Sequence, residues 1–276
     1  MKNGIVIETN AEYHGYTSAI SKSRLSRMSV CPAYFKWHEE NPQKKSDELL
    51  EGSAFHKLVL EPETFDDEFV VAPKFDRRTK IGKQEYADFC EMVESTGKEV
   101  LTEEQYDMIC GMRDAVMANS YCRKLIKGNI EQSIYFTEDM TGVECKIRPD
   151  VLRKLDGIID IIDLKSTRSA LPMDFARDVV KFHYDLQAYM YSYGASKTFG
   201  VPMNKISFFF IAVEKKPPYL INVMLALPDV IEKGDADFRK YIGMYEECMR
   251  TGNWYGLNGS QDIINDLILP QTYNKK

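Results

Sequence analysis

Residues 131–165 form the segment that most restricts how this chain can fold. Residues 133–138 and 143–148 are rich in apolar and β-branched side chains, and the turn residues 139–142 between them predict a β-hairpin. Residues 158–164 are too apolar for an exposed edge strand, and a short turn precedes them. We therefore expect a buried three-stranded meander.

Three charged residues occupy unexpected places in this meander. Asp150 follows Pro149, where the second strand should bend, and Asp163 and Lys165 lie two residues apart in the third strand. Residues two apart share a strand face, and the hairpin partner should bring Asp150 beside them. Two neighbouring carboxylates repel each other, and a divalent cation such as Mg²⁺ relieves that repulsion. A lysine beside the cation can orient or deprotonate a water, so the group predicts phosphodiester hydrolysis.

Each charge taken alone also has a structural explanation. Asp163 and Lys165 could form an ion pair at the end of a strand, and Asp150 could cap a turn, since most charged residues are part of solvated structure. Taken together, Pro149-Asp150 followed by Asp163-Leu164-Lys165 after a short apolar strand matches the PD-(D/E)XK nuclease signature.

Four segments carry a wider resemblance, in the order SAISKSRLSRM, EGSAFHKLVLEPETF, CKIRPD with IIDLKST, and YDLQAYMY, and they span residues 18–193. Through them the chain resembles the RecE-type exonucleases of phages and prophages (exodeoxyribonuclease VIII), and more distantly the RecB nuclease domain and lambda exonuclease. The resemblance implies an α/β fold (α+β in some schemes) with a restriction-endonuclease-like core, in which helices flank a mixed central sheet.

The same resemblance implies a set of metal ligands. Asp150, Asp163 and the backbone carbonyl of Leu164 would hold one or two Mg²⁺ or Mn²⁺ ions beside the catalytic Lys165. His56 lies on a predicted helix over residues 46–60, where a lone histidine is more often a core residue than a ligand.

The G-x-x-x-H pattern of the resembling proteins makes His56 a ligand nevertheless. Glu131 could be an ordinary surface charge, but the resemblance implies an acid near this point that helps to hold the metals, so Glu131 is a further candidate ligand.

A polar residue on the predicted helix over residues 182–198 also points to function. Gln187 shares a helix face with Tyr184, Ala188 and Tyr191, and a buried glutamine is costly without partners. Gln187 and Tyr191 match the Q-x-x-x-Y motif of RecB-like nucleases, which implies that Gln187 positions the lysine or the DNA. Tyr191 is then a candidate DNA contact.

The net charge of −6 is the sum over the molecule, whereas DNA responds to the local field. Arg24 and Arg27 lie in one basic cluster, and Arg77, Arg78 and Lys80 lie in a second, within a predicted loop. Either cluster could be no more than a solvated face. Arg148, before Pro149, is a further candidate for phosphate contact.

The length of 276 residues, the 44% hydrophobic content and the absence of a linker favour a single nuclease domain. Within it we expect a helical part (about 18–130), the catalytic meander (131–166), C-terminal helices with a strand pair (182–250) and a tail (253–276).

Several cofactors and locations are disfavoured by the sequence. The six cysteines form no C-x-x-C pair, and only Cys248 lies late in the chain, which argues against an iron-sulfur cluster. The nucleotide-binding motifs G-x-x-x-x-G-K-[ST] and G-x-G-x-x-G are absent from the sequence. The sequence contains neither a bilayer-spanning apolar stretch nor a signal-peptide core, so we expect a cytoplasmic protein of a bacterial or phage-infected cell.

The resemblance implies a double-stranded DNA exonuclease that degrades 5′ to 3′ and leaves 3′ single-stranded tails for recombination by annealing. It further implies a homo-oligomeric ring, a trimer or tetramer, around DNA ends, and a RecT-type single-strand annealing protein as partner. A Cas4-like end-trimming nuclease, an endonuclease of the same superfamily and a non-catalytic DNA-end clamp remain alternatives.

Overall fold

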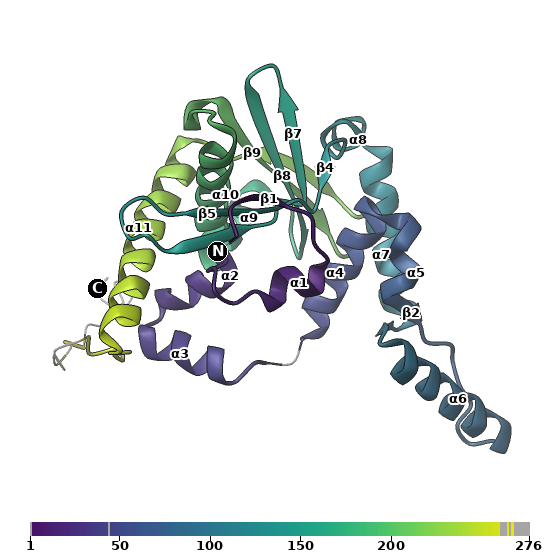
Figure 1. Ribbon diagram of the computed structural model, residues 1–276. Coiled ribbons are helices and arrows are strands. Elements are labelled where there is room, and N and C mark those ends of the chain that lie inside the picture. The colour runs from purple at the N-terminus through teal and green to yellow at the C-terminus, as the bar shows by residue number, and fades with distance from the viewer. Residues whose placement is uncertain (1, 44, 260–263, 265, 268–276) are drawn as a thin grey trace, which may run out of the picture.

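The computed structural model describes residues 2–43, 45–259, 264 and 266–267. A mixed five-stranded sheet lies at its centre (Figure 1). Its order is β10 (Ile221–Leu225), β9 (Ile206–Glu214), β8 (Ile158–Thr167), β7 (Val151–Leu155) and β4 (Asn129–Ile130). Strands β8 and β9 are parallel, and the other neighbours are antiparallel. The chain passes from β8 to β9 through two helices, as a parallel crossover requires.

Strand β8 is buried on both faces of the sheet, as its apolar sequence predicts. Ile159 and Ile161 pack into one hydrophobic cluster, and Ile162 and Leu164 pack into another. The turn before β8 is formed by Asp156 and Gly157, both with positive φ, which suits a tight hairpin.

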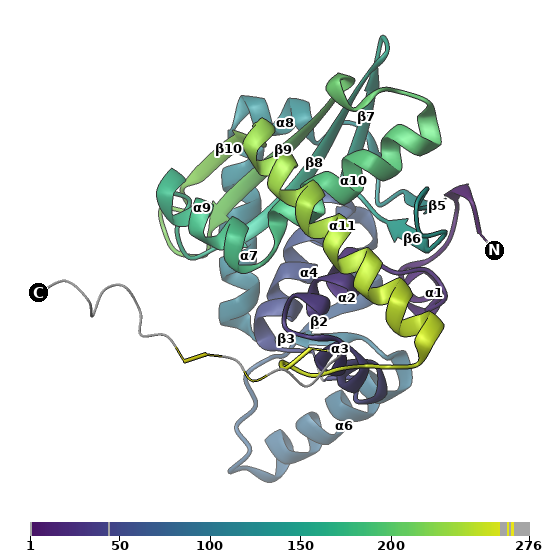
Figure 2. The same ribbon diagram turned by 90° about the vertical axis from the view of Figure 1, so that its left-hand side faces the viewer.

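Helices cover both faces of this sheet, so the body has three layers (Figures 1 and 2). The face of Ile159 and Ile161 packs against α9 (Pro172–Lys181), α10 (Tyr184–Phe199) and α11 (Pro228–Thr251). The opposite face packs against α4 (Asp47–Leu60), α7 (Glu103–Ala118) and α8 (Ser120–Leu125). The predicted α/β architecture with a mixed, helix-flanked sheet is confirmed.

A second, antiparallel sheet contains β1 (Gly4–Val6), β5 (Ser133–Thr137) and β6 (Glu144–Ile147). The predicted hairpin over residues 133–148 is confirmed, but the single three-stranded meander is wrong. Strand β6 ends at Ile147, and β7 starts a new hairpin in the central sheet at Val151. Pro149 lies between them, and because it lacks an N–H group and has a fixed φ, it interrupts the strand ladder.

The N-terminal segment is helical, as predicted. It contains α1 (Asn10–Gly15), α2 (Lys22–Leu25), the 3₁₀ helix η1 (Ser26–Ser29) and α3 (Pro32–Glu40). Helix α4 begins after Ser46, whose side chain accepts a hydrogen bond from the Leu49 amide. Helix α7 begins with a capping box between Thr102 and Gln105.

An arm extends from the body between α4 and α7. After η2 (Pro62–Thr64) and α5 (Phe65–Glu68), the parallel strands β2 (Phe69–Val71) and β3 (Glu99–Leu101) form its stem. Helix α6 (Lys80–Thr96) projects away from the central sheet in both views (Figures 1 and 2). This arm carries the second basic cluster.

From the sequence we expect Trp254, Leu267 and Ile268 of the tail to pack on the body or on another subunit. Trp254 stacks on Phe35 at 5.4 Å between ring centroids, so the start of the tail packs on the body. Leu267 is 96% exposed and does not pack on this chain, and Ile268 lies outside the described residues.

Among the described residues, no helix combines the length and apolar character needed to cross a bilayer. The 3₁₀ helix η3 (Met203–Lys205) precedes β9.

Gly234 permits the close contact of α11 with α10. A Cβ atom at Gly234 would lie 2.1 Å from the Asp185 carbonyl oxygen, whereas a Cβ at Gly243 in the same helix would meet nothing within 4 Å. We expect Gly234→Ala to lower the free energy of unfolding by about 1–3 kcal/mol, because two helix backbones must separate. Gly243→Ala should instead raise it by up to about 1 kcal/mol. Urea unfolding measures both, and equal effects of the two substitutions would contradict this account.

Candidate active site

The three charged residues of the signature meet where β7 begins and β8 is still continuing. Val151 pairs with Ile162, so Asp150 lies opposite Asp163. Asp163 and Lys165 share the β8 face that α10 covers, and Lys165 Nζ lies 2.6 Å from Asp163 Oδ2. The structure therefore brings together the three residues that the sequence selects.

Asp150 completes the strand ladder at this point. Its Oδ2 atom accepts a 2.6 Å hydrogen bond from the Leu164 amide. Leu164 lies two residues beyond Ile162, which pairs with the first residue of β7. The N–H and C=O groups of one strand residue point to the same edge. The Leu164 carbonyl therefore faces the edge of β8 where Asp150 lies, as a metal ligand would need to.

Two further residues reach Asp150 from other elements. His56 on α4 places Nδ1 3.4 Å from Asp150 Oδ2. One ligand atom each from His56, Glu131 and Asp150 lies within 4.8 Å of the others. Glu131 has a φ of 48° and its amide donates to the Asp150 carbonyl, so its backbone is held in a sparsely populated conformation beside the site.

Gln187 holds Asp163 in place. Its Nε2 atom donates a 2.5 Å hydrogen bond to Asp163 Oδ1, and only 7% of the residue is exposed. Gln187 therefore contacts the carboxylate that also pairs with Lys165. Its predicted role in positioning the lysine or the DNA stays a prediction. Tyr191 lies one turn further along α10 and packs against Phe208 in the core, which favours support of the site over contact with DNA.

Burial and mutual charge shift the pKa values of the histidine, the lysine and the carboxyl groups of the site. Burial alone lowers the pKa of His56, but the Asp150 carboxylate outweighs it and raises the pKa to about 9. Burial, with the Asp150 charge, raises the pKa of Glu131 to about 8. Burial opposes the charge of Lys165, yet Asp163 and Asp150 outweigh it and raise its pKa. Without a bound cation, His56, Glu131 and Lys165 therefore keep their protons at neutral pH.

These residues fit a divalent metal ion. Asp163 Oδ2 is buried and accepts no hydrogen bond of regular geometry, although Lys165 lies beside it. Carboxylate oxygens and an imidazole nitrogen are ligands that divalent ions take. A cation would compensate carboxylates that now depend on retained protons and on Lys165.

The first basic cluster has a structural role. Arg24 donates from Nε and Nη2 to the Glu39 carboxylate, and Arg27 Nη1 lies 3.0 Å from the same group. The prediction that these two arginines bind DNA therefore finds no support. Lys22 from the same segment lies at the site instead, because its Nζ is 5.3 Å from the centroid of the Tyr184 ring, which Lys165 approaches at 4.8 Å.

The second cluster lies on the arm, away from the site. Arg77 stacks on Tyr86 at 4.3 Å, Arg78 pairs with Asp76 at 3.0 Å, and Lys80 is the exposed first residue of α6. The structure thus places Lys80 in a helix, not in the expected loop.

Arg148 is mostly buried and pairs with Glu131 at 3.0 Å. It contacts a candidate ligand and lines a cavity that His56 and Glu131 also line, so its predicted phosphate contact stays a prediction.

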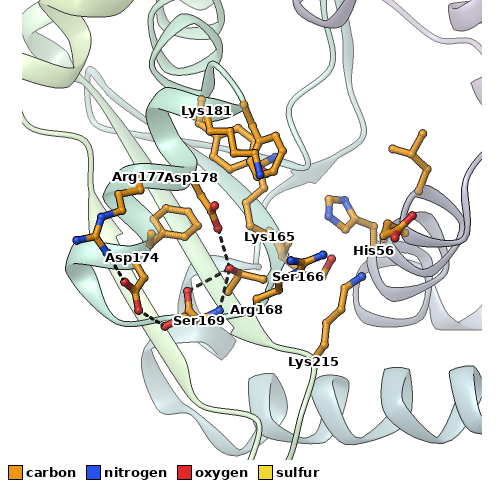
Figure 3. Close-up of a pocket in the computed structure, with 18 of the residues that line it drawn as sticks. His56, Lys165, Ser166, Arg168, Ser169, Asp174, Arg177, Asp178, Lys181 and Lys215 are labelled. Carbon is orange, nitrogen blue, oxygen red and sulfur yellow. Dashed lines mark hydrogen bonds and ion pairs between the residues drawn. The ribbon is translucent and has the colours of Figure 1, made fainter. Parts of the chain in front are cut away.

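A cavity that the sequence did not lead us to expect lies beside Lys165. It has a volume of about 910 Å³ and lies between α4 and α9 (Figure 3). Arg168, Lys181 and Phe182 line it with Lys165. The signal for it was present in the sequence, since Arg168 follows the signature strand directly and Lys181-Phe182 joins a cation to an aromatic residue.

The fold and the signature residues together define a PD-(D/E)XK nuclease. The chain belongs to the family of PDDEXK-like domains of unknown function, DUF3799, whose sequence profile matches residues 21–266. No protein of curated function matches the chain by sequence.

Among solved structures, "Putative exonuclease" from Eubacterium rectale has a TM-score of 0.65 at 15% identity and covers 98% of each chain. At this identity the similarity concerns the fold, and it agrees with a restriction-endonuclease-like core. The solved structure of SSO0001 has a TM-score of 0.30 at 13% identity, over 83% of this chain and 89% of that chain, which is too low to indicate a shared fold.

The His56–Asp150 pair predicts a pH-dependent stability of the metal-free protein. Because the pKa of His56 rises from 6.5 to about 9 on folding, its stabilisation is complete below pH 6.5 and is lost as the pH rises through 9. In EDTA, the stability of the wild type relative to His56→Gln should fall by about 3 kcal/mol over that range. Urea unfolding at several pH values measures this difference, and a constant difference would refute the ion pair.

Proposed function

We propose that this protein is a Mg²⁺- or Mn²⁺-dependent double-stranded DNA exonuclease that degrades 5′ to 3′ and leaves 3′ single-stranded tails. The observation that carries the proposal is the meeting of Asp150, Asp163 and Lys165 with His56 and Glu131 in one mostly buried cluster. Perturbed titratable groups around a cleft are typical of catalytic sites.

His56, Asp150, Asp163 and the Leu164 carbonyl, with Glu131, would hold one or two divalent ions. When bound there, such an ion supplies Lewis-acid activation of water and of the scissile phosphate.

Lys165 keeps its proton while the charges of Asp163 and Asp150 are uncompensated, so it can hold a phosphate oxygen or a water. Compensation of those charges would lower its pKa and suit it to accept a proton from that water. Gln187 acts as a positioning residue, because it fixes the Asp163 carboxylate.

The choice of an exonuclease rests on the resemblance to RecE-type enzymes, and the name of the Eubacterium rectale structure agrees with it. The same resemblance supports a role in recombination in the cytoplasm of a bacterial or phage-infected cell. A RecT-type annealing protein would then receive the single strands.

End-labelled linear duplex DNA with Mg²⁺ tests the activity. We expect release of the 5′ label from linear duplex and no cleavage of a closed circle of the same sequence. Lys165→Ala should reduce hydrolysis at least about a hundredfold, because it removes a cation beside the reacting phosphate. Lys154→Ala, an exposed lysine at the far end of β7, is the matched control.

Other outcomes would favour the alternatives. Nicking of the circle would indicate an endonuclease, and release of short fragments limited to the ends would indicate a Cas4-like trimming enzyme. Binding of duplex ends without hydrolysis by any divalent ion would indicate a DNA-end clamp.

We further propose that the protein forms a ring of three or four copies around the DNA. Light scattering coupled to size exclusion should give three or four times the chain mass at micromolar concentration. A monomer at every concentration tested would refute the ring and would leave the catalytic assignment intact.

A further inference from the structure

Two cavities of different charge meet at His56. The larger one, of about 910 Å³, lies toward α9, and a smaller one of about 200 Å³ lies toward α1. Ser53 and His56 line both. Five basic and three acidic side chains line the larger cavity, whereas Lys57 and Arg148 face three glutamates in the smaller one. A polyanion would therefore approach the site from the α9 side.

Two of the three acidic side chains of the larger cavity hold its wall. Asp178 accepts a hydrogen bond from Thr167 Oγ1 at 3.2 Å, and Asp174 accepts one from Ser169 Oγ at 2.9 Å (Figure 3). These bonds fasten α9 to the segment that follows β8. The wall is thus preformed beside Lys165, and a ligand need not order it.

Two cations of this wall form no ion pair within the part of the chain that the structure describes, although the charge of Arg168 helps to lower the pKa of the exposed Glu48 carboxyl. Arg177 pairs with Asp174 at 2.7 Å, and Lys215 pairs with Glu51 at 2.8 Å. Arg168 is exposed and makes no hydrogen bond or ion pair with any described residue.

Lys181 also lacks an ion pair within the described ranges, and its ammonium lies 5.0 Å from the centroid of the Phe182 ring. Arg168 and Lys181 are therefore available to an anionic ligand, and phosphate groups suit them.

An exposed aromatic ring links Lys181 to the Tyr184 ring beside the catalytic lysine. Phe182 is 45% exposed at the end of α9, and its ring centroid is 5.7 Å from that of Tyr184, which Lys165 approaches. Aromatic rings beside a basic groove are the features with which proteins hold single-stranded nucleic acid, because every base can stack on them.

We propose that the α9 cavity binds the single DNA strand that is being cut, with Arg168 and Lys181 on its phosphates and Phe182 stacked on a base. This inference rests on the proposed function and adds the path by which the strand reaches Lys165.

Binding of a single-stranded oligonucleotide in EDTA tests the path without hydrolysis. The probe is a short DNA strand with a terminal 2-aminopurine, whose fluorescence falls when the base stacks. We expect Arg168→Ala with Lys181→Ala to weaken binding at least about tenfold and to flatten its salt dependence. Phe182→Ala should abolish most of the quenching, and Phe182→Tyr should retain it. Urea unfolding verifies that each variant is folded.

Lys154→Ala with Lys205→Ala is the matched control, because it removes two exposed lysines at the opposite end of the sheet. It should bind as the wild type does. Unchanged binding in the Arg168 and Lys181 variant, or full quenching in Phe182→Ala, would overturn the proposal.

The two proposals fail separately. If the wild type hydrolyses DNA and the Arg168 and Lys181 variant does so with unchanged KM, the strand path is wrong and the nuclease assignment stands. If no divalent ion supports hydrolysis but the variants lose oligonucleotide binding, the path stands and the catalytic proposal is wrong.

Discussion

The hydrogen bond from the Leu164 amide to Asp150 Oδ2 is the contact on which the arrangement of the site depends. Pro149 interrupts the chain between β6 and β7, and the Asp150 side chain takes the place of a main-chain acceptor for the Leu164 amide, two residues beyond the last β7–β8 pair. One carboxylate thus both continues the sheet and stands opposite Asp163. A residue that merely capped a turn would not need to be buried beside a second carboxylate.

The burial of several charges at one point has a cost that the fold compensates only in part. Lys165 and Gln187 each contact one oxygen of Asp163, and His56 contacts Asp150. The pKa of Glu131 nevertheless rises to about 8, since burial and the Asp150 charge both disfavour its ionised form. A cluster that must retain protons in order to remain buried gains free energy when a cation replaces them. This is the physical reason to regard the cluster as a metal site.

Much of this site was predictable because its information is local. The i, i+2 spacing of Asp163 and Lys165 fixes their common face, and a two-residue hairpin turn brings Asp150 opposite. The roles of Arg24 and Arg27 were not predictable, because Glu39 meets them only after α3 folds back on α2. The division of the meander into two sheets follows from Pro149, which interrupts the strand ladder, whereas the sequence led us to expect only a bend of one strand there.

The net charge of −6 is compatible with a DNA enzyme because the charges are distributed unevenly. Asp178 and Asp174 of the α9 wall accept hydrogen bonds from Thr167 and Ser169, and Arg177 pairs with Asp174. The basic side chains opposite them extend into the cavity (Figure 3). A phosphate chain would therefore meet a positive field at Arg168 before it reaches the carboxylates, where only a bound cation could make its approach favourable. The positive field at Arg168 and the carboxylates further along the same cavity together give the substrate a direction of entry.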